Sequence, residues 1–520
     1  MLTKWWSSQL IWSAMIPMIC SCQSESKGSR TNRLEPKVVQ VDLQMNKTFQ
    51  TVAHFGASDA WSCQFVGLWP DQKKNAMAEL LFSREADSGG HPKGIGLSLW
   101  RFNIGAGSAE QGEESGIRDE WRRAESFMKG DGSYDWSKQA GQVWFAHAAQ
   151  EFGVPNLLVF PNSPPVHMTK NGKAYANNGE ANLASSRFDD FGNYMADVIK
   201  GMERKGLHVD YISPVNEPQW DWSDGGQEGT PFLNTDIAGI VRSLDASLSE
   251  KGLTTKIDIA EAGKINYLYE DADKPARGRQ IKQFFDQGSE NYIGNLSHVG
   301  NAISGHSYFT TSPYTAAIQQ RQNLATEMKT MDGLEYWMSE YCILGDNGGE
   351  INGSGRDLGI NAALYMARVV HNDLTVSNAS AWHWWLAISP YDYKDGLIYI
   401  DSDKHDGEYY ESKMLWSLGN YSRFIRPGYQ RKGVSIDGAK AQSADFLVSA
   451  FMDPEENELV YVIVNSGIAP VAVSLSVDGE SVSPSKTYMT SDTLDLAPVD
   501  IENQVVTIPE RTIATIIVNQ

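Results

Sequence analysis

Short apolar runs alternate with longer amphipathic segments from about residue 50 to residue 425. The amphipathic segments carry apolar residues at helical spacing, as over residues 188–204 and 235–253, which predicts helices. The apolar runs between them are short enough for buried strands. Eight such runs predict strands at residues 54–56, 96–102, 156–160, 211–215, 256–260, 302–306, 335–338 and 379–382.

This alternation of strand and helix is typical of parallel βαβ units. Eight units over residues 51–425 predict a (β/α)8 TIM barrel, an α/β fold whose active site lies at the carboxyl ends of the strands. An open doubly wound sheet is the alternative that uses the same units.

The pattern changes after residue 425. Four apolar runs separated by turn residues show little helical periodicity, at residues 459–464, 471–476, 505–508 and 513–518. We expect a small antiparallel β-sandwich there. The early run at residues 38–43 precedes the first barrel strand and could join it, so the predicted side domain comprises residues 38–50 and 426–520.

The first 21 residues have the features of an export signal. Lys4 precedes an apolar run at residues 10–19 that is too short to cross a bilayer. The run ends in Ile19-Cys20-Ser21-Cys22, which resembles a bacterial lipobox, so we expect lipidation of Cys22 after cleavage. Residues 22–37 form a tether in this interpretation, and the exported protein is held by its lipid in a bacterial membrane, the outer one by preference. An ordinary signal peptide with an incidental cysteine is the alternative.

The charge and the cysteine content of the chain limit which partners and which cysteine chemistry are expected. The chain has 44 Lys and Arg against 65 Asp and Glu, a net charge of −21. We expect no nucleic-acid partner, because phosphate binding needs a basic surface, and membrane contact only through the lipid.

Cys63 and Cys342 remain after processing; an exported location permits a disulfide, but two buried free thiols are the favoured interpretation.

Two glutamates follow predicted strands on opposite sides of the barrel. Glu217 lies in the segment Asn216-Glu217-Pro218 after the fourth strand, and Glu340 ends the seventh. Two carboxyl groups flanking one bond are the requirement of glycoside hydrolysis. A salt bridge explains a lone strand-end glutamate, but two that match in strand order and local motif favour catalysis.

The chain resembles glycoside hydrolase family 30 from about His54 to the C-terminus. The resemblance rests on the order of seven motifs, at residues 55–61, 101–105, 162–165, 216–218, 306–308, 339–340 and 384. It implies a retaining double displacement, with Glu217 as general acid/base and Glu340 as nucleophile. Electrostatics supports these roles, because the negative charge of an ionised Glu340 nearby favours a proton on Glu217.

The resemblance also implies roles for residues around this pair. Three of them support the nucleophile: Arg101, Tyr308 and His306, the last of which could equally be a satisfied core histidine. The residues implied to bind the sugar are Asp59, Trp61, His167, Asn216 and Trp384. His167 stands where many family members carry Trp. Three tryptophans close together on the last strand cannot all face the sugar, so Trp384 is assigned there and Trp382 to packing.

The sequence contains no phosphate-binding glycine loop, no dinucleotide motif and no zinc spacing among its ten histidines, so we expect no cofactor and no metal. The expected partner is a β-linked glycan. The first-loop motif at residues 57–61 looks most like the endo-β-1,6-galactanase branch of the family. The alternatives are an exo-acting β-glucosidase or β-xylosidase, a β-1,6-glucanase of the same family, and a non-catalytic sugar-binding lipoprotein.

Overall fold

The computed structural model describes residues 38–437, 443–501 and 504–519. The expected signal peptide, the lipidation site at Cys22 and the tether lie outside these residues. Among the helices of the described ranges, none is both long and apolar enough to cross a membrane.

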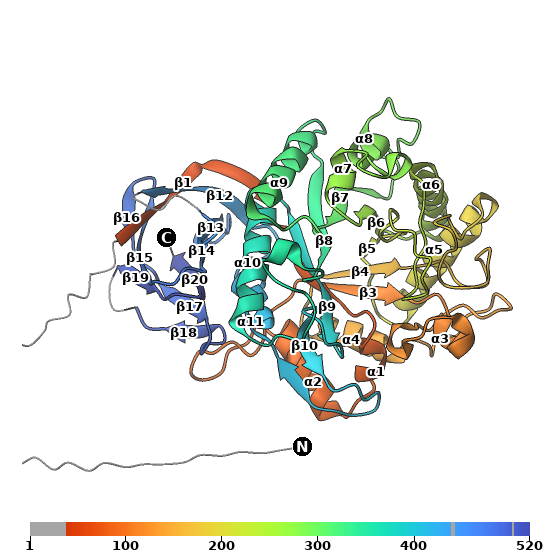
Figure 1. Cartoon of the computed structure of the whole chain (residues 1–520), viewed down its shortest axis with the longest axis horizontal. Helices are drawn as coiled ribbons and strands as arrows, with labels where there is room; N and C mark the ends of the chain where they lie inside the picture. Colours follow the sequence, from red (N-terminus) through yellow and green to blue (C-terminus); the bar gives the residue numbers. More distant parts are fainter. Residues whose placement is uncertain (1–37, 438–442, 502–503, 520) are drawn as a thin grey trace, which may run out of the picture. The chain divides into compact units, whose positions relative to one another are not determined.

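Residues 54–389 contain a closed barrel of eight parallel strands, of which β3 to β9 are labelled in Figure 1. The strands follow one another in chain order, and the last pairs with both its predecessor and the first. They are β2 (His54–Ser58), β3 (Leu99–Ile104), β4 (Asn156–Pro161), β5 (Tyr211–Ile212), β6 (Lys256–Ala262), β7 (Val299–His306), β8 (Glu335–Tyr341) and β9 (Ala381–Ser389). The predicted TIM barrel is confirmed, and each expected strand overlaps an observed one.

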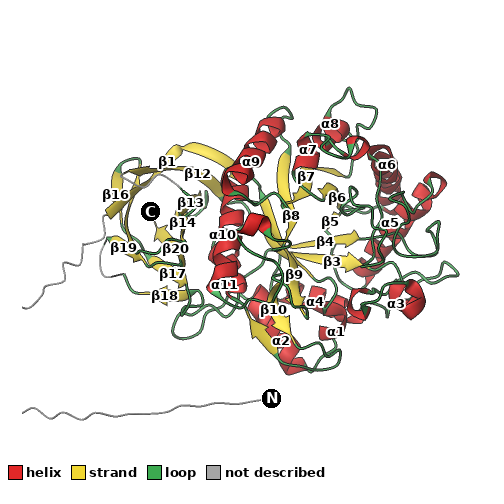
Figure 2. Cartoon of the chain, viewed as in Figure 1, coloured by secondary structure: helices red, strands yellow, loops and turns green. Residues whose placement is uncertain are grey.

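Helices surround the barrel strands, as the colouring in Figure 2 shows. The principal ones are α2 (Asp71–Phe82), α4 (Ala140–Glu151), α5 (Phe188–Arg204), α6 (Asn234–Lys251), α9 (Tyr314–Met328) and α10 (Ile360–Thr375). The amphipathic pattern determines how they pack: in α5 the buried residues Phe191, Met195, Val198 and Met202 recur every three or four positions. Because helices cover the outer face and side chains fill the interior, a strand such as β9 is buried at every position.

Two further strands extend the barrel sheet beyond β9. β10 (Gly396–Ile400) pairs with β9 in parallel, and β11 (Tyr409–Glu411) pairs with β10 in antiparallel orientation. The sequence pattern did not predict them. They lead into α11 (Lys413–Ser422), which contacts the side domain: the Asn420 side chain donates to Thr515 Oγ1 at 2.9 Å.

The side domain is one curled ten-stranded sheet with a core of its own. Its strands are β1 (Val38–Thr51), β12 (Gln430–Asp437), β13 (Phe446–Met452), β14 (Glu458–Asn465), β15 (Val471–Val477), β16 (Glu480–Val482), β17 (Lys486–Thr490), β18 (Ala497–Val499), β19 (Val505–Ile508) and β20 (Thr512–Asn519). The early run joins it as expected, between β12 and β15. One pairing differs from the antiparallel expectation, because β1 and β15 run parallel.

Both described cysteines, Cys63 and Cys342, are buried free thiols. This agrees with the simpler of the two expectations from the sequence.

Candidate active site

Glu217 lies in the loop that follows the short strand β5. Its backbone is in the left-handed region, with φ of 44°. Two hydrogen bonds hold it there: its N–H donates to the Glu261 carbonyl at 2.9 Å, and its own carbonyl accepts from the Trp222 indole at 3.1 Å. The residue is buried except for 7% of its surface, and its carboxyl group lines a cleft at the carboxyl ends of the strands.

Glu340 lies on β8 with a donor on each carboxylate oxygen. Arg101 Nη1 donates to Oε2 at 2.5 Å, and the Tyr308 hydroxyl donates to Oε1 at 3.0 Å. Burial raises the pKa of Glu340 above its usual value, while the positive charges of His306 and Arg101 oppose that rise. Acceptance of hydrogen bonds by both oxygens matches the ionised form, which is the form a nucleophile needs.

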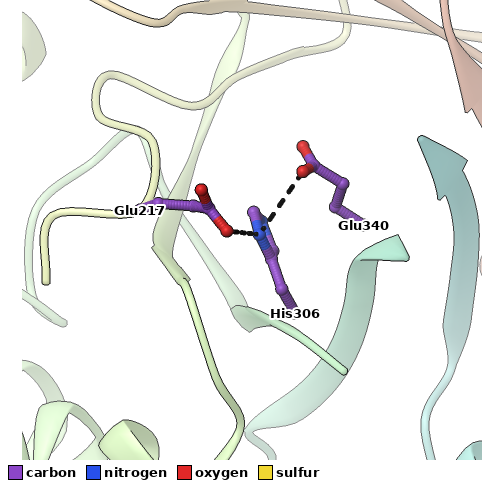
Figure 3. Close-up of side chains that lie close together, drawn as sticks. All are labelled: Glu217, His306 and Glu340. Atoms are coloured by element: carbon purple, nitrogen blue, oxygen red, sulfur yellow. Dashed lines mark hydrogen bonds and ion pairs between the residues drawn. The ribbon is translucent and has the colours of Figure 1, made fainter. Parts of the chain in front are cut away.

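The two carboxyl groups meet at His306, at the end of β7 (Figure 3). His306 Nδ1 is 3.0 Å from Glu217 Oε1 and 3.6 Å from Glu340 Oε1. One carboxylate oxygen of Glu217 and one of Glu340 lie within 4.8 Å of each other. This spacing is close to the separation of about 5–5.5 Å that direct nucleophilic displacement uses, and shorter than the separation of about 6.5–9.5 Å found in inverting enzymes.

A third buried carboxylate, Glu261 at the end of β6, contacts the Arg101 and His306 side chains that also contact Glu340. It pairs with Arg101 Nη2 at 3.0 Å and with His306 Nε2 at 2.7 Å, and it accepts from the Ser339 hydroxyl at 2.6 Å. Burial alone would raise the pKa of Glu261, but Arg101 and His306 lower it far below its usual value. The sequence reasoning missed this residue, although a glutamate directly after the predicted strand 256–260 was the available signal.

The buried carboxyl groups, Glu261 among them, keep Arg101 and His306 charged. Burial alone would lower the pKa of His306, but the surrounding carboxyl groups, Glu340 foremost, raise it to about 10. Burial alone would lower the pKa of Arg101, but its carboxylate partners Glu261 and Glu340 raise that pKa above the ordinary value. Two cations, Arg101 and His306, therefore balance two anions, Glu261 and Glu340.

Within the described ranges, the side chains of Glu217, His306 and Glu340 also come close enough together to hold a metal ion. Both ring nitrogens of His306 face carboxylates, and its raised pKa keeps both protonated near neutral pH. An imidazolium has no free lone pair to offer. The donor set therefore does not fit a metal ion.

The cleft around the carboxyl pair has a volume of about 680 Å³. Aromatic side chains form much of its wall, as is common in sugar sites. Those lining it are Trp220, Trp222, Tyr308, Phe309 and Trp385. Phe309 is 55% exposed, so this aromatic surface extends from the buried carboxyl pair to the solvent-exposed rim.

Two expected sugar contacts lie elsewhere. Trp384 is fully buried away from the cleft, and its indole donates to the Asp395 carbonyl at 2.6 Å. His383 contacts the His54 ring inside the barrel. Because successive side chains of a strand point to opposite faces, Trp382 and Trp384 point outward, and Trp385 points inward like His383. The prediction for Trp384 is corrected to Trp385. His167 is exposed, with its ring beside Gly130, and is absent from the cleft wall.

Of the three remaining expected sugar contacts, Asn216 lines the cleft, whereas Trp61 and Asp59 do not. Asn216 lines the cleft and accepts from Arg101 Nη2 at 3.3 Å. Trp61 lies behind the wall, with its ring edge-on to Trp385 at 5.3 Å. Asp59 is buried beside Asn103, whose N–H it accepts at 2.8 Å, and burial raises its pKa to about 8.

The family is shown by sequence comparison. The model of O-glycosyl hydrolase family 30 matches residues 38–399, and the chain belongs to this family. It is therefore a glycoside hydrolase of a family that works with retention, on a β-linked glycan.

Individual proteins of known sequence or structure share between 21% and 35% of their residues with this chain. An endo-β-1,6-galactanase of Hypocrea rufa is 24% identical over 393 residues, 72% of this chain and 72% of that protein. The glucuronoxylanase XynC of Bacillus subtilis strain 168 is 21% identical over 369 residues, 70% of this chain and 74% of that protein. A solved structure described as a conserved exported protein from Bacteroides fragilis is 35% identical, with a TM-score of 0.85, and covers 92% of this chain and 100% of its own.

Proposed function

We propose that Glu340 is the nucleophile and Glu217 the general acid/base of a retaining β-glycosidase. The observation that carries this assignment is the pair of carboxylate oxygens within 4.8 Å, with Glu340 fixed by Arg101 and Tyr308. In the first step, a Glu340 oxygen forms a bond to the anomeric carbon as the glycosidic bond breaks, and Glu217 gives its proton to the leaving oxygen. In the second step, Glu217 takes a proton from water, whose oxygen displaces Glu340.

The charge balance of the cluster supports this change of role. While Glu340 is an anion, a proton on Glu217 keeps the cluster neutral. Once Glu340 becomes an uncharged ester, Arg101, His306 and Glu261 leave one net positive charge beside Glu217. That charge favours the carboxylate form of Glu217, which is the form that accepts a proton from water.

For the substrate, we propose the interior β-1,6 linkages of galactan. The curated relative that acts as an endo-β-1,6-galactanase supports this choice. The aromatic wall from Trp385 to the exposed Phe309 supports binding of more than one sugar.

The test is a product profile on β-1,6-galactan, β-1,6-glucan and glucuronoxylan, with the Glu340→Gln variant as a matched blank. We expect a ladder of short galacto-oligosaccharides from wild type alone. Release of a single small sugar from chain ends would replace the endo assignment with an exo one. Activity on another polymer would replace the substrate, and equal background from both proteins would favour a sugar-binding role.

We further propose export and lipidation at Cys22. The lipobox-like segment supports this, as does similarity to a solved structure described as an exported protein. Expression of wild type and Cys22→Ala with radiolabelled palmitate tests it. Label in the wild type alone is the expected result, and equal absence of label from both proteins would contradict it.

A further inference from the structure

A second cavity lies between the barrel and the side domain, apart from the active-site cleft. Its volume is about 370 Å³, and it is lined by residues of helices α9 and α10 and of strands β1, β12 and β13. None of its lining residues lines the cleft that holds Glu217 and Glu340. Its size is within the range of small-ligand sites.

The wall of this cavity is positively charged. Lys47, Arg431 and Lys432 line it, and no Asp or Glu is among the lining residues. In a chain with 65 acidic and 44 basic residues, this local excess is the reverse of the overall charge. The cavity is thus suited to an anion.

The two innermost cations, Arg431 and Lys432, are each only 6% exposed. Within the described part of the chain, neither forms an ion pair. Arg431 donates to the side-chain oxygens of Gln50 at 2.9 Å and Asn378 at 2.5 Å. Lys432 donates to Thr48 Oγ1 at 2.8 Å. Buried charges are ordinarily paired, so two cations with only neutral partners lack a counter-ion.

Neutral groups suited to a sugar complete the wall. Asn372 and Ser449 are among the lining residues and are 3% and 2% exposed, and neither Asn372 Oδ1 nor Ser449 Oγ has a hydrogen-bond partner among the described residues. Phe49 is 45% exposed at the same cavity and stacks on Arg431, with the guanidinium carbon 3.7 Å from the ring centre. Cations, unsatisfied polar groups and an aromatic side chain together match a ligand that is both charged and hydroxylated.

We propose that this cavity is a second carbohydrate-binding site, selective for an acidic sugar that carries a carboxylate. The carboxylate binds the Arg431 guanidinium, the sugar ring packs beside Phe49, and Lys47 adds positive charge at the same cavity. The site holds an acidic residue of a glycan outside the active-site cleft, so its occupancy is separable from hydrolysis.

Isothermal titration of the mature protein with sodium D-glucuronate tests the proposal, with D-glucose and sodium sulfate as the neutral and inorganic comparisons. We expect glucuronate to bind, glucose to bind far more weakly, and added salt to weaken the glucuronate signal. The Arg431→Gln variant should lose roughly tenfold or more in glucuronate affinity, because a charge-assisted hydrogen bond is removed. The Lys486→Gln variant removes one positive charge elsewhere on the same sheet and should bind as wild type does.

Hydrolysis of an aryl β-glycoside by the Arg431→Gln variant, at the wild-type rate, shows that the fold and the cleft are intact. Lys47→Gln is the second variant, because Lys47 is exposed and its loss does not disturb buried packing. It should weaken glucuronate binding in the same direction. No binding to wild type, equal binding to wild type and both variants, or sulfate binding as tight as glucuronate binding would overturn the proposal.

Discussion

Replacement of Glu261 by Gln tests the buried charge cluster with little change in shape. Glu261 Oε2 lies 2.7 Å from His306 Nε2. For unit charges at this separation, Coulomb's law at an effective dielectric constant of about 20 gives roughly 6 kcal/mol. Solvent and local relaxation reduce this figure, so we expect the pKa of His306 to fall by at least about 2 units, equivalent to about 2.7 kcal/mol.

The assay is NMR titration of protein labelled with ¹⁵N at histidine. The chain has ten histidines, and loss of one signal in His306→Gln assigns the resonance. Wild-type His306 should titrate near pH 10. In Glu261→Gln the midpoint should move to lower pH, and kcat on an aryl β-glycoside should decline at high pH along with it, because the imidazolium that supports Glu340 is lost.

Ser339→Ala is the matched control, because it removes a hydrogen bond to Glu261 Oε2 and leaves the charge in place. It should move the His306 midpoint by clearly less than Glu261→Gln does. A His306 midpoint in Glu261→Gln within half a unit of wild type would refute the role given to Glu261.

Three further substitutions are informative. Glu217→Ala should lose about 10²–10⁴-fold in kcat on natural glycosides but far less on aryl glycosides with good leaving groups, which need no proton; equal losses would argue against its acid role. Asp59 has a pKa of about 8 through burial, so native stability falls as pH rises from about 4 to 8; Asp59→Asn should flatten Tm between pH 5 and 8, and an unchanged slope would contradict this. In Gly229→Ala the new Cβ would lie 2.4 Å from the Trp222 ring; kcat/KM on polymer should fall roughly tenfold or more, and a wild-type value would show that Trp222 is not needed.

The barrel strands could be predicted because both faces of a parallel strand are buried, which leaves continuous apolar runs in the sequence. The strands β12 and β17 could not be identified in this way. The three buried positions of β12 are Arg431, Lys432 and Gly433, and its other residues are only partly buried or exposed, so its apolar signal is weak. β17 has only five residues.

The carboxyl pair could be predicted because strand order places the ends of the fourth and seventh strands across one opening. Trp384 and Trp385 could not be told apart in this way, since the choice depends on which face of β9 meets the barrel interior. Glu261 was missed because no motif surrounds it, although its position at a strand end follows the same logic as Glu340. Its importance arises from its contacts with Arg101 and His306, which three separate strands bring together.

Trapping of the glycosyl-enzyme tests whether Glu340 forms a covalent bond to the sugar. The protein would be incubated with an activated 2-deoxy-2-fluoro-β-galactoside, digested with a protease and mapped by mass spectrometry. We expect one fluoroglycosyl unit on the peptide that contains Glu340, and none in Glu340→Gln. If instead the label forms on another residue, or if turnover of an activated β-glycoside gives the inverted anomer first, Glu340 is not the nucleophile.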